Sequence, residues 1–321
     1  MRMRSRLMLG TIVSVPFVIC GCDRPRASSA DAAAPAQSVD AAVSIHCKTD
    51  PSFPSPLDVP EASGAAEIEL RSGVRELLVV SDSDRKGAAL AYALPSGPAR
   101  KLTLPIDPRV SDDVEGIAWW AGHLYAVVST GYIERFSPAT SDAGNGRDAR
   151  DPPGGSGFAR DIDAYPLGPA PFVAGWATPS DYPPDFEGLC LRAPSSAARC
   201  AGYAASRAYG WLLCLVFDGE RLRVNPDHPR LALNVPNKSL SDCAFGAADG
   251  PARDTLLVAT NIRGGSTVYR VDEGNGALTP IDVEGTLNDE AVAVDHEGRL
   301  YQLMDGNSAQ SPAVRAACTG W

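Results

Sequence analysis

A short apolar segment that opens on an acidic residue recurs five times along this chain of 321 residues. The acidic residues that mark the five copies are Glu61, Glu115, Glu187, Asp242 and Glu290. Consecutive markers are 54, 72, 55 and 48 residues apart. A repeat of this length that holds several β-strands is typical of one blade of a β-propeller. We therefore expect an all-β chain of five blades, with five carboxylates facing one another at one mouth of a central channel.

Runs of strand-forming residues, bounded by Gly, Asp, Pro and Asn, fill the space between the markers. In the first unit these runs are 77–82, 89–94 and 101–104, and in the third they are 200–206, 211–217 and 221–224. In the fourth they are 255–260, 267–271 and 278–283. The fifth unit has only 291–294, 299–304 and 313–317. We expect segment 41–47, from the other end of the chain, to supply its outer strand and seal the ring. A sixth blade within 162–178 is the alternative.

The first residues have the pattern of an export signal, and we do not expect them to be part of the fold. Three arginines precede a short apolar stretch, which is too short to span a bilayer. Gly21-Cys22 ends this stretch and resembles a bacterial lipobox, so we predict cleavage before Cys22 and lipidation of that cysteine. An ordinary signal peptide is the alternative. Cleavage would remove three positive charges from a chain whose net charge is already −10.

The chain then divides by composition into a tether and a folded domain. Residues 22–44 are rich in Ala, Ser and Pro and lack the apolar residues that a core requires. We therefore predict a signal peptide at 1–21, a disordered tether at 22–44 and a propeller at 45–321. A Gly/Asp/Pro-rich stretch near 141–157 is predicted to be a disordered insert within the propeller. The expected location is the cell envelope, with a monomer held at the membrane by its lipid anchor.

Six cysteines remain after the two at the end of the signal, an even number that suggests disulfides in an exported protein. Cys47 and Cys318 lie near the two ends of the predicted ring and are expected to pair as the ring closes. Cys190 and Cys200 flank a predicted hairpin turn, which favours a second pair. That leaves Cys214 for Cys243. No CxxC pair or histidine cluster has the spacing of a zinc site.

A second set of polar residues is expected at the same mouth as the five markers. The strand after each marker returns antiparallel to that face, and the residues at its end are Asp82, Thr130, Arg207, Asn261 and Asp305. Crowded carboxylates repel one another and must bind protons or a cation. Oxygen ligands suit calcium, although another divalent cation would also fit. The alternative interpretation is that these residues only form turns and cap strands.

The motifs Leu78-Val79-Val80-Ser81-Asp82, Val114-Glu115-Gly116-Ile117 and Phe186-Glu187-Gly188-Leu189 resemble exported bacterial propellers of the esterase-like phytase and SdiA-regulated groups. The segment 287–301 resembles gluconolactonase-like propellers more distantly. In that family a Glu, an Asn and an Asp hold a catalytic metal, which implies Glu115 or Glu187, Asn261 and Asp289 here. The family's Glu-Gly-Pro motif is absent, because Ile117 and Leu189 stand in place of its proline. The basic phosphate site of a phytase is also absent from the sequence.

The acidic composition argues against nucleic acid as a partner, because phosphate binding needs clustered Lys and Arg. There is no Gly-x-Ser-x-Gly elbow, and none of the four histidines lies beside a motif that suggests a nucleophile pair. We therefore expect a lipoprotein whose propeller binds a small molecule or a protein, with calcium at the channel mouth. The alternative is a metal-dependent hydrolase of a small ester, lactone or phosphoester.

Overall fold

The computed structural model describes residues 45–71, 74–82, 86–139, 157–168, 185–193, 198–235, 240–261, 267–283, 289–304 and 310–321. These residues form strands and turns, and among them no helix is long and apolar enough to cross a membrane. Contacts divide the chain into Met1–Ala42 and Val43–Trp321, and every described residue belongs to the second unit. The predicted signal peptide, Cys22, the tether and nearly all of the insert lie outside the described residues.

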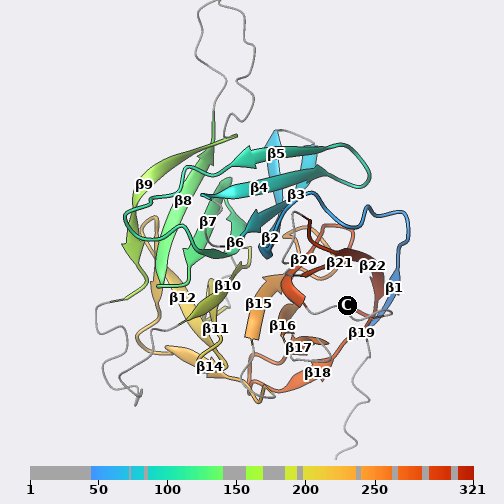
Figure 1. Cartoon of the computed structure of the whole chain (residues 1–321). Helices are drawn as coiled ribbons and strands as arrows, with labels where there is room; N and C mark the ends of the chain where they lie inside the picture. The colour runs from blue at the N-terminus through green and yellow to red at the C-terminus, as the bar shows by residue number, and fades with distance from the viewer. Residues whose placement is uncertain are drawn as a thin grey trace, which may run out of the picture. The chain divides into compact units, whose positions relative to one another are not determined.

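Five sheets of mainly antiparallel strands form the ring, and in the first four the first strand in the chain is the innermost (Figure 1). Blade one is β2 (Ala62–Arg71), β3 (Val74–Ser81), β4 (Ala88–Ala93) and β5 (Ala99–Thr103). Blade two is β6 (Val114–Trp120), β7 (His123–Val128), β8 (Tyr132–Pro138) and β9 (Phe158–Pro166). Blade three is β10 (Phe186–Leu191), β11 (Gly202–Ser206), β12 (Trp211–Asp218) and β13 (Arg221–Val224), with β14 (Arg230–Ala232) also on β12.

Blade four is β15 (Leu240–Phe245), β16 (Leu256–Thr260), β17 (Thr267–Val271) and β18 (Leu278–Pro280). Blade five combines both ends of the folded chain: β20 (Asp289–Val294), β21 (Arg299–Met304) and β22 (Ala313–Thr319) pair in order, and β1 (His46–Thr49) and β19 (Asp282–Val283) complete the sheet. The prediction of a five-bladed propeller is confirmed. Residues 158–166 are the outer strand of blade two and do not begin a sixth blade.

The innermost strands β2, β6, β10, β15 and β20 surround the central axis, and each contacts the next, with β20 returning to β2 (Figure 1). The hydrophobic core is divided into five layers, one between each pair of neighbouring blades. Leu78 of blade one, for example, packs with Phe136 of blade two. The ring is therefore held by blade-to-blade burial of apolar side chains, which is the main favourable term in folding.

The inner strands approach one another so closely that glycine is required on two of them and a third glycine lies in a tight contact. A Cβ atom added to Gly116 would lie 2.3 Å from the backbone nitrogen of Leu189 in the next blade. A Cβ on Gly188 would lie 2.5 Å from a carboxylate oxygen of Asp242, and one on Gly64 would lie 3.0 Å from the Cα of Gly116. The small residue after each acidic marker in blades two and three thus has a packing role.

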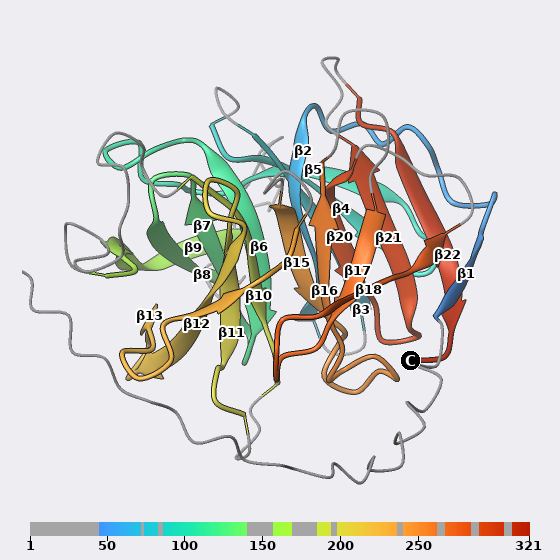
Figure 2. The same ribbon diagram turned by 90° about the horizontal axis from the view of Figure 1, so that it is seen from below.

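The two ends of the folded chain meet in blade five, at the right-hand edge of Figure 2. β1 pairs antiparallel with β22, and Cys47 lies opposite Cys318 in the register. A disulfide joins these two cysteines. The predicted strand from the N-terminal side and the predicted terminal disulfide are both confirmed. The strand begins at His46, it is not the outermost one because β19 lies outside it, and residues 41–44 of the predicted segment lie outside the described residues.

The other two predicted disulfide pairings are wrong. Cys190 pairs with Cys243, and Cys200 pairs with Cys214. Cys190 lies opposite Tyr203 in the β10–β11 ladder, so Cys200 falls beyond the paired residues and does not face it. Cys190 instead packs in the layer between blades three and four, where Cys243 of the neighbouring inner strand is within bonding distance.

Candidate functional site at the channel mouth

Each innermost strand carries a β-bulge near its start, where one residue has no partner on the adjacent strand. The register skips one residue in every blade, and the skipped residues are Ser63, Glu115, Glu187, Ser241 and Glu290. Bulges are common at rims and next to sites, where they re-aim a side chain. The repeated bulge therefore defines one structurally equivalent position per blade at the mouth of the channel.

Three of the five predicted acidic markers occupy this position, and two do not. Glu115, Glu187 and Glu290 are the bulged residues of blades two, three and five. Glu61 lies two residues before the bulge of blade one, and Asp242 lies one residue after that of blade four. The sequence alignment of the markers therefore differs from their alignment in space.

Asp242 has a different local environment from the other markers. Its side chain is buried, and its carboxylate accepts the backbone N–H of Cys243 at 2.7 Å and that of Val292 at 2.8 Å. Val292 belongs to blade five, so the carboxylate joins two neighbouring inner strands. Burial raises the pKa of Asp242 well above its ordinary value, against the effect of these two N–H donors. Asp242 is placed as a structural link between blades.

A second set of polar positions lies just outside the bulges in blades one to three. The carbonyls of Glu61, Asp113 and Asp185 accept the N–H of the residue that follows the second strand, at 2.9, 3.1 and 3.0 Å. Glu61 and Asp185 both have left-handed backbones, with φ of 46° and 44°. Glu61 is thus the counterpart of Asp113 and Asp185 rather than of Glu115 and Glu187.

The donors in these three bonds are Asp82, Ser129 and Arg207. Two of them belong to the predicted second polar ring, but in blade two the position is occupied by Ser129. Thr130, which the sequence predicted there, is exposed in the following turn. Asp305, the predicted member from blade five, lies outside the described residues.

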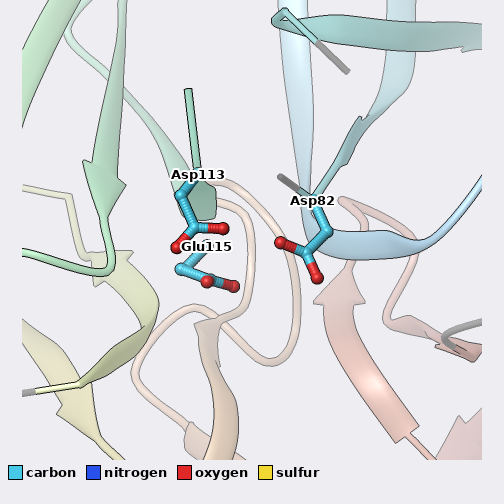
Figure 3. Close-up of side chains that lie close together, drawn as sticks. All are labelled: Asp82, Asp113 and Glu115. Carbon is cyan, nitrogen blue, oxygen red and sulfur yellow. The ribbon is translucent and has the colours of Figure 1, made fainter. Parts of the chain in front are cut away.

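Three carboxylates converge where blades one and two meet. Oxygens of Asp82, Asp113 and Glu115 all lie within 4.8 Å of one another. Figure 3 shows Asp113 and Glu115 side by side, with the carboxylate of Asp82 facing them from the neighbouring blade. Asp82 directly follows β3, Glu115 is the bulged residue of β6, and Asp113 lies two residues before it. Asp113 is held by the hydroxyl of Ser129, which donates to its Oδ2 at 2.5 Å.

Glu115 is the most deeply buried of these three side chains, at 8% exposed. No hydrogen bond or ion pair from the part of the chain that the structure describes reaches its carboxylate. Burial raises the pKa of Glu115 strongly, and the nearby carboxylates of Glu187, Asp82 and Asp113 raise it further. A buried carboxylate with this surrounding must take up a proton or a cation.

The next blade presents an acid that does have a counter-charge. The guanidinium of Arg207 lies 2.8 Å from Oε1 of Glu187 and 3.1 Å from Oδ2 of Asp185. Burial still raises the pKa of Glu187, although Arg207 opposes the shift. The mouth therefore contains a cluster of three carboxylates next to an acidic pair that Arg207 binds, and the charge of Arg207 also opposes the raised pKa of Glu115.

The remaining predicted ligands lie elsewhere around the ring. The side-chain amide of Asn261 donates to Glu290, so these two residues of blades four and five bind each other. Asp289 starts β20, and its side chain is outside the described part of the structure. The gluconolactonase-like resemblance implied a metal-binding trio of Glu115 or Glu187, Asn261 and Asp289. The contacts of the described residues do not bring these three together.

The three-carboxylate cluster offers only oxygen donors, the ligand type that Ca²⁺ and Mg²⁺ prefer. Two of its members, Asp82 and Glu115, were among the residues predicted for the mouth, whereas Asp113 was not. The signal for Asp113 is present in the sequence, since blades two and three both read acid-x-Glu at 113–115 and 185–187. The residue types and the burial of Glu115 fit a divalent cation.

No family model matches this chain, and no curated protein matches its sequence. Among solved structures it is similar to a streptogramin B lyase (10% identity, TM-score 0.40, covering 86% of this chain and 97% of that one). It is also similar to virginiamycin B lyase from Staphylococcus aureus (11% identity, TM-score 0.39), with 76% of this chain matched to 63% of that one. A putative 6-phosphogluconolactonase from Bacteroides uniformis shows 12% identity and a TM-score of 0.35 over 72% of this chain and 61% of that one. At these values the likenesses carry no argument about function, and the fold rests on the five sheets themselves.

Proposed function

We propose that this protein is a lipid-anchored envelope protein whose propeller binds a ligand and holds a divalent cation, with calcium the first candidate, at its acidic mouth. The observation that carries the proposal is the convergence of Asp82 and Asp113 on the buried carboxylate of Glu115, which no described residue binds by a hydrogen bond or an ion pair. A divalent cation bound there would offset the repulsion that otherwise raises the pKa of Glu115.

Calcium binding is tested by calorimetry and by thermal melts in calcium and in chelator. A cation that binds only the folded state adds about 2.7 kcal/mol at a hundredfold excess over its dissociation constant, so the melting temperature should rise by several degrees. Glu115→Gln and Asp82→Asn should each remove most of that rise. Asp254→Asn is the matched control, because Asp254 is exposed, 67% by side chain, and lies in the turn between β15 and β16.

The absence of binding heat at millimolar calcium, magnesium and manganese would contradict the cation site. So would an unchanged calcium response in Glu115→Gln. A response lost equally in Asp254→Asn would show that the effect is a general one of acidic surface charge.

Membrane anchoring is supported by the lipobox-like Gly21-Cys22 and by three disulfides, which are consistent with export to an oxidising compartment. Metabolic labelling with a palmitate analogue should tag the protein, and Cys22→Ser should abolish the tag while the propeller still folds. Equal labelling of this variant would contradict lipidation at Cys22.

The metal-dependent hydrolase remains the second candidate, and the pair Glu187–Arg207 favours it. A glutamic acid whose pKa is raised can donate a proton to a leaving group, and an adjacent arginine can stabilise an anion. A panel of esters, lactones and phosphoesters, assayed with and without calcium, tests this. Turnover that Glu187→Gln abolishes without loss of calcium binding would support an enzyme, and no turnover on the whole panel would contradict it.

A further inference from the structure

A second site candidate lies at the other end of the central channel. A cavity of about 420 Å³ is lined by the later halves of all five innermost strands, whereas the acidic cluster lies at their beginnings. Its lining runs through residues 65–69 of blade one and 117–121 of blade two, and includes the turn 246–249 of blade four. Small-molecule sites in proteins have volumes of about 300–1,000 Å³, so the cavity is large enough for a specific ligand.

The wall of the cavity is apolar and is built from the core. Ile117 and Leu189 line it while being only 2% and 1% exposed, and Trp119 and Phe245 add aromatic rings. These side chains belong to layers between blades and are therefore fixed by packing on both sides. A rigid apolar wall favours a ligand with an apolar or aromatic body, because burial of that body removes its surface from water.

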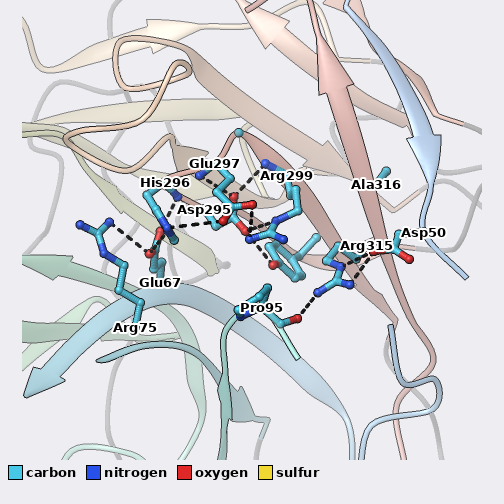
Figure 4. A network of polar contacts seen from close by, with 12 residues as sticks. Asp50, Glu67, Arg75, Pro95, Asp295, His296, Glu297, Arg299, Arg315 and Ala316 are labelled. Atoms are coloured by element: carbon cyan, nitrogen blue, oxygen red, sulfur yellow. Dashed lines mark hydrogen bonds and ion pairs between the residues drawn. The ribbon is translucent and has the colours of Figure 1, made fainter. Parts of the chain in front are cut away.

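The charged residues that line the cavity are mostly acidic. They are Glu67, Glu69, Asp249 and Arg75. Arg75 is already bound, since it makes two bonds to Asp249 at 2.6 and 3.0 Å. It also lies 3.3 Å from Glu67, and Figure 4 shows this contact. Its guanidinium is thus shared by two of the three acids, and carboxylates outnumber cationic side chains among the charged residues of the lining.

Glu67 is the acid that is most firmly positioned. Its carboxylate accepts the backbone N–H of His296 at 2.6 Å and lies 2.7 Å from Nδ1 of the same histidine, which comes from blade five (Figure 4). Burial raises the pKa of Glu67, against the effect of His296 and Arg75. The acids at the opposite mouth lie on the same axis, and a channel lined by one sign of charge concentrates ions of the other sign.

We infer that this cavity binds a small molecule with an apolar body and a protonated amine. The body lies against Ile117, Leu189 and Phe245, and the ammonium group lies at the rim near Glu67, Glu69 and Asp249. Aromatic rings such as that of Trp119 also attract a cation placed over their faces. The inference rests on the proposed ligand-binding function, and it assigns the ligand to the mouth opposite the cation site.

The test uses three probes that share a naphthalene ring and differ in charge. They are protonated 2-(1-naphthyl)ethylamine, which is positive, 1-naphthaleneacetate, which is negative, and 1-naphthaleneethanol, which is neutral. Binding to the full propeller is followed by probe and tryptophan fluorescence and by calorimetry. The ammonium probe should bind at least tenfold more tightly than the acetate probe, with the neutral alcohol between them. Equal affinity for ammonium and acetate, or no saturable binding of any probe, would overturn the inference.

Two kinds of variant locate the binding. Ala66→Leu places a larger side chain in the cavity, because Ala66 lies at a partly buried position on β2 that lines it. This variant should bind all three probes about tenfold more weakly. Glu69→Gln with Asp249→Asn should weaken only the ammonium probe, whereas the exposed Asp58→Asn, outside the cavity lining, should change nothing. Unchanged binding in both cavity variants would also overturn the site.

The cation site and the cavity are separated by a further measurement. Glu115→Gln should lose the calcium response and keep the ammonium probe, because Glu115 lies at the other mouth. Melting temperature and calcium response, measured on Ala66→Leu, establish that this variant is folded. Loss of probe binding in Glu115→Gln at an unchanged melting temperature would contradict the placement of the ligand in the cavity.

Discussion

At the scale of single residues, the mouth of the channel is controlled by what occupies the bulge of each inner strand. Blades one and four have serine there, and Ser63 donates its hydroxyl to the carbonyl of Val114 in the next blade at 2.5 Å. Blades two, three and five have glutamate there, and the three glutamate side chains lie in different environments. Glu187 lies beside the guanidinium of Arg207, Glu290 accepts a hydrogen bond from the amide of Asn261, and Glu115 faces two further carboxylates. The same backbone position therefore yields a packing contact, an ion pair or a candidate cation site.

The raised pKa values of Glu115 and Glu187 predict how stability depends on pH in chelator. Each group holds its proton in the folded state at pH values where the unfolded chain, with a Glu pKa of about 4.3, has lost it. The folded state then binds more protons than the unfolded state, so the free energy of unfolding falls as pH rises from 5 to 9. The slope is at most about 1.4 kcal/mol per pH unit for each such carboxyl.

Urea denaturation at a series of pH values measures this slope. Asp50 and Asp249, whose pKa values are lowered, act only below this window and do not interfere. Glu115→Gln should reduce the slope, and calcium should reduce it in the unmodified protein, while Asp254→Asn should leave it unchanged. The slope that remains comes from other buried carboxyls with raised pKa values, among them Asp242 and Glu67. A free energy of unfolding that stays constant or rises between pH 5 and 9 would contradict the buried, unpaired state of Glu115.

The sequence located this mouth but not the membership of the cluster, and the reason is the bulge. An acidic residue before a small apolar run is visible in all five repeats, yet a shift of one or two residues changes where the side chain goes. Glu61 and Ser63 are both polar residues before the same glycine, and only the register shows that Ser63 is the equivalent of Glu115. Asp113 was missed because the first acid of an acid-x-Glu motif reads equally well as a turn residue.

At the scale of elements, neighbouring blades are joined by more than apolar packing. The disulfide Cys190–Cys243 links the inner strands β10 and β15, and Asp242 links β15 with β20 through its bond to Val292. Cys200–Cys214, by contrast, lies within blade three. The strands themselves were largely predictable, since 221–224 and 267–271 match β13 and β17. Segment 278–283 was predicted as one strand but divides, because its last two residues leave blade four and pair with β1.

We predict that the disulfide between two blades contributes more to the free energy of unfolding than the disulfide within one blade. Cys190 and Cys243 are 53 residues apart, and Cys200 and Cys214 are 14 apart. On chain-entropy grounds the losses are about 4 and about 3 kcal/mol, respectively. Urea denaturation of the two double alanine variants should rank them in this order, and non-reducing peptide mapping should recover both pairs. Recovery of a Cys190–Cys200 peptide would contradict the pairing.

At the scale of the whole molecule, the ring is closed by strands from opposite ends of the sequence. β1 adds to β22, Cys47 is bound to Cys318, and Arg315 holds Asp50, at the end of β1, with its guanidinium nitrogens at 3.0 and 2.5 Å. Figure 4 shows this ion pair beside the Asp295–Arg299 pair of the same blade. The meeting of the ends was predictable because a closed ring requires it. The pairing of the internal cysteines was not, because it depends on which face of each strand looks toward the next blade.

Because it closes the ring, the disulfide between Cys47 and Cys318 is predicted to have a large effect on the free energy of unfolding. Cys47 and Cys318 are 271 residues apart, the longest of the three loops, so the double alanine variant should lose about 5 kcal/mol of unfolding free energy. Limited proteolysis should then cleave first near β1, which is a strand of only four residues at the end of the folded chain. Equal stability of the variant and the unmodified protein in urea would show that packing alone closes the ring.

The folded chain begins and ends in adjacent strands of one blade. The position of the two termini therefore determines only which blade comes first in the sequence, and not how the blades are arranged in the ring. Joining residue 321 to residue 45 would replace the link that Cys47–Cys318 now makes, and new ends opened at the Gly219–Glu220 turn of blade three would leave all five sheets intact. Chain termini that lie close together are what makes circular permutation tolerable. This propeller is therefore a circular arrangement encoded in a linear chain, and an export signal or an anchor could be moved to another blade without redesign of the two mouths.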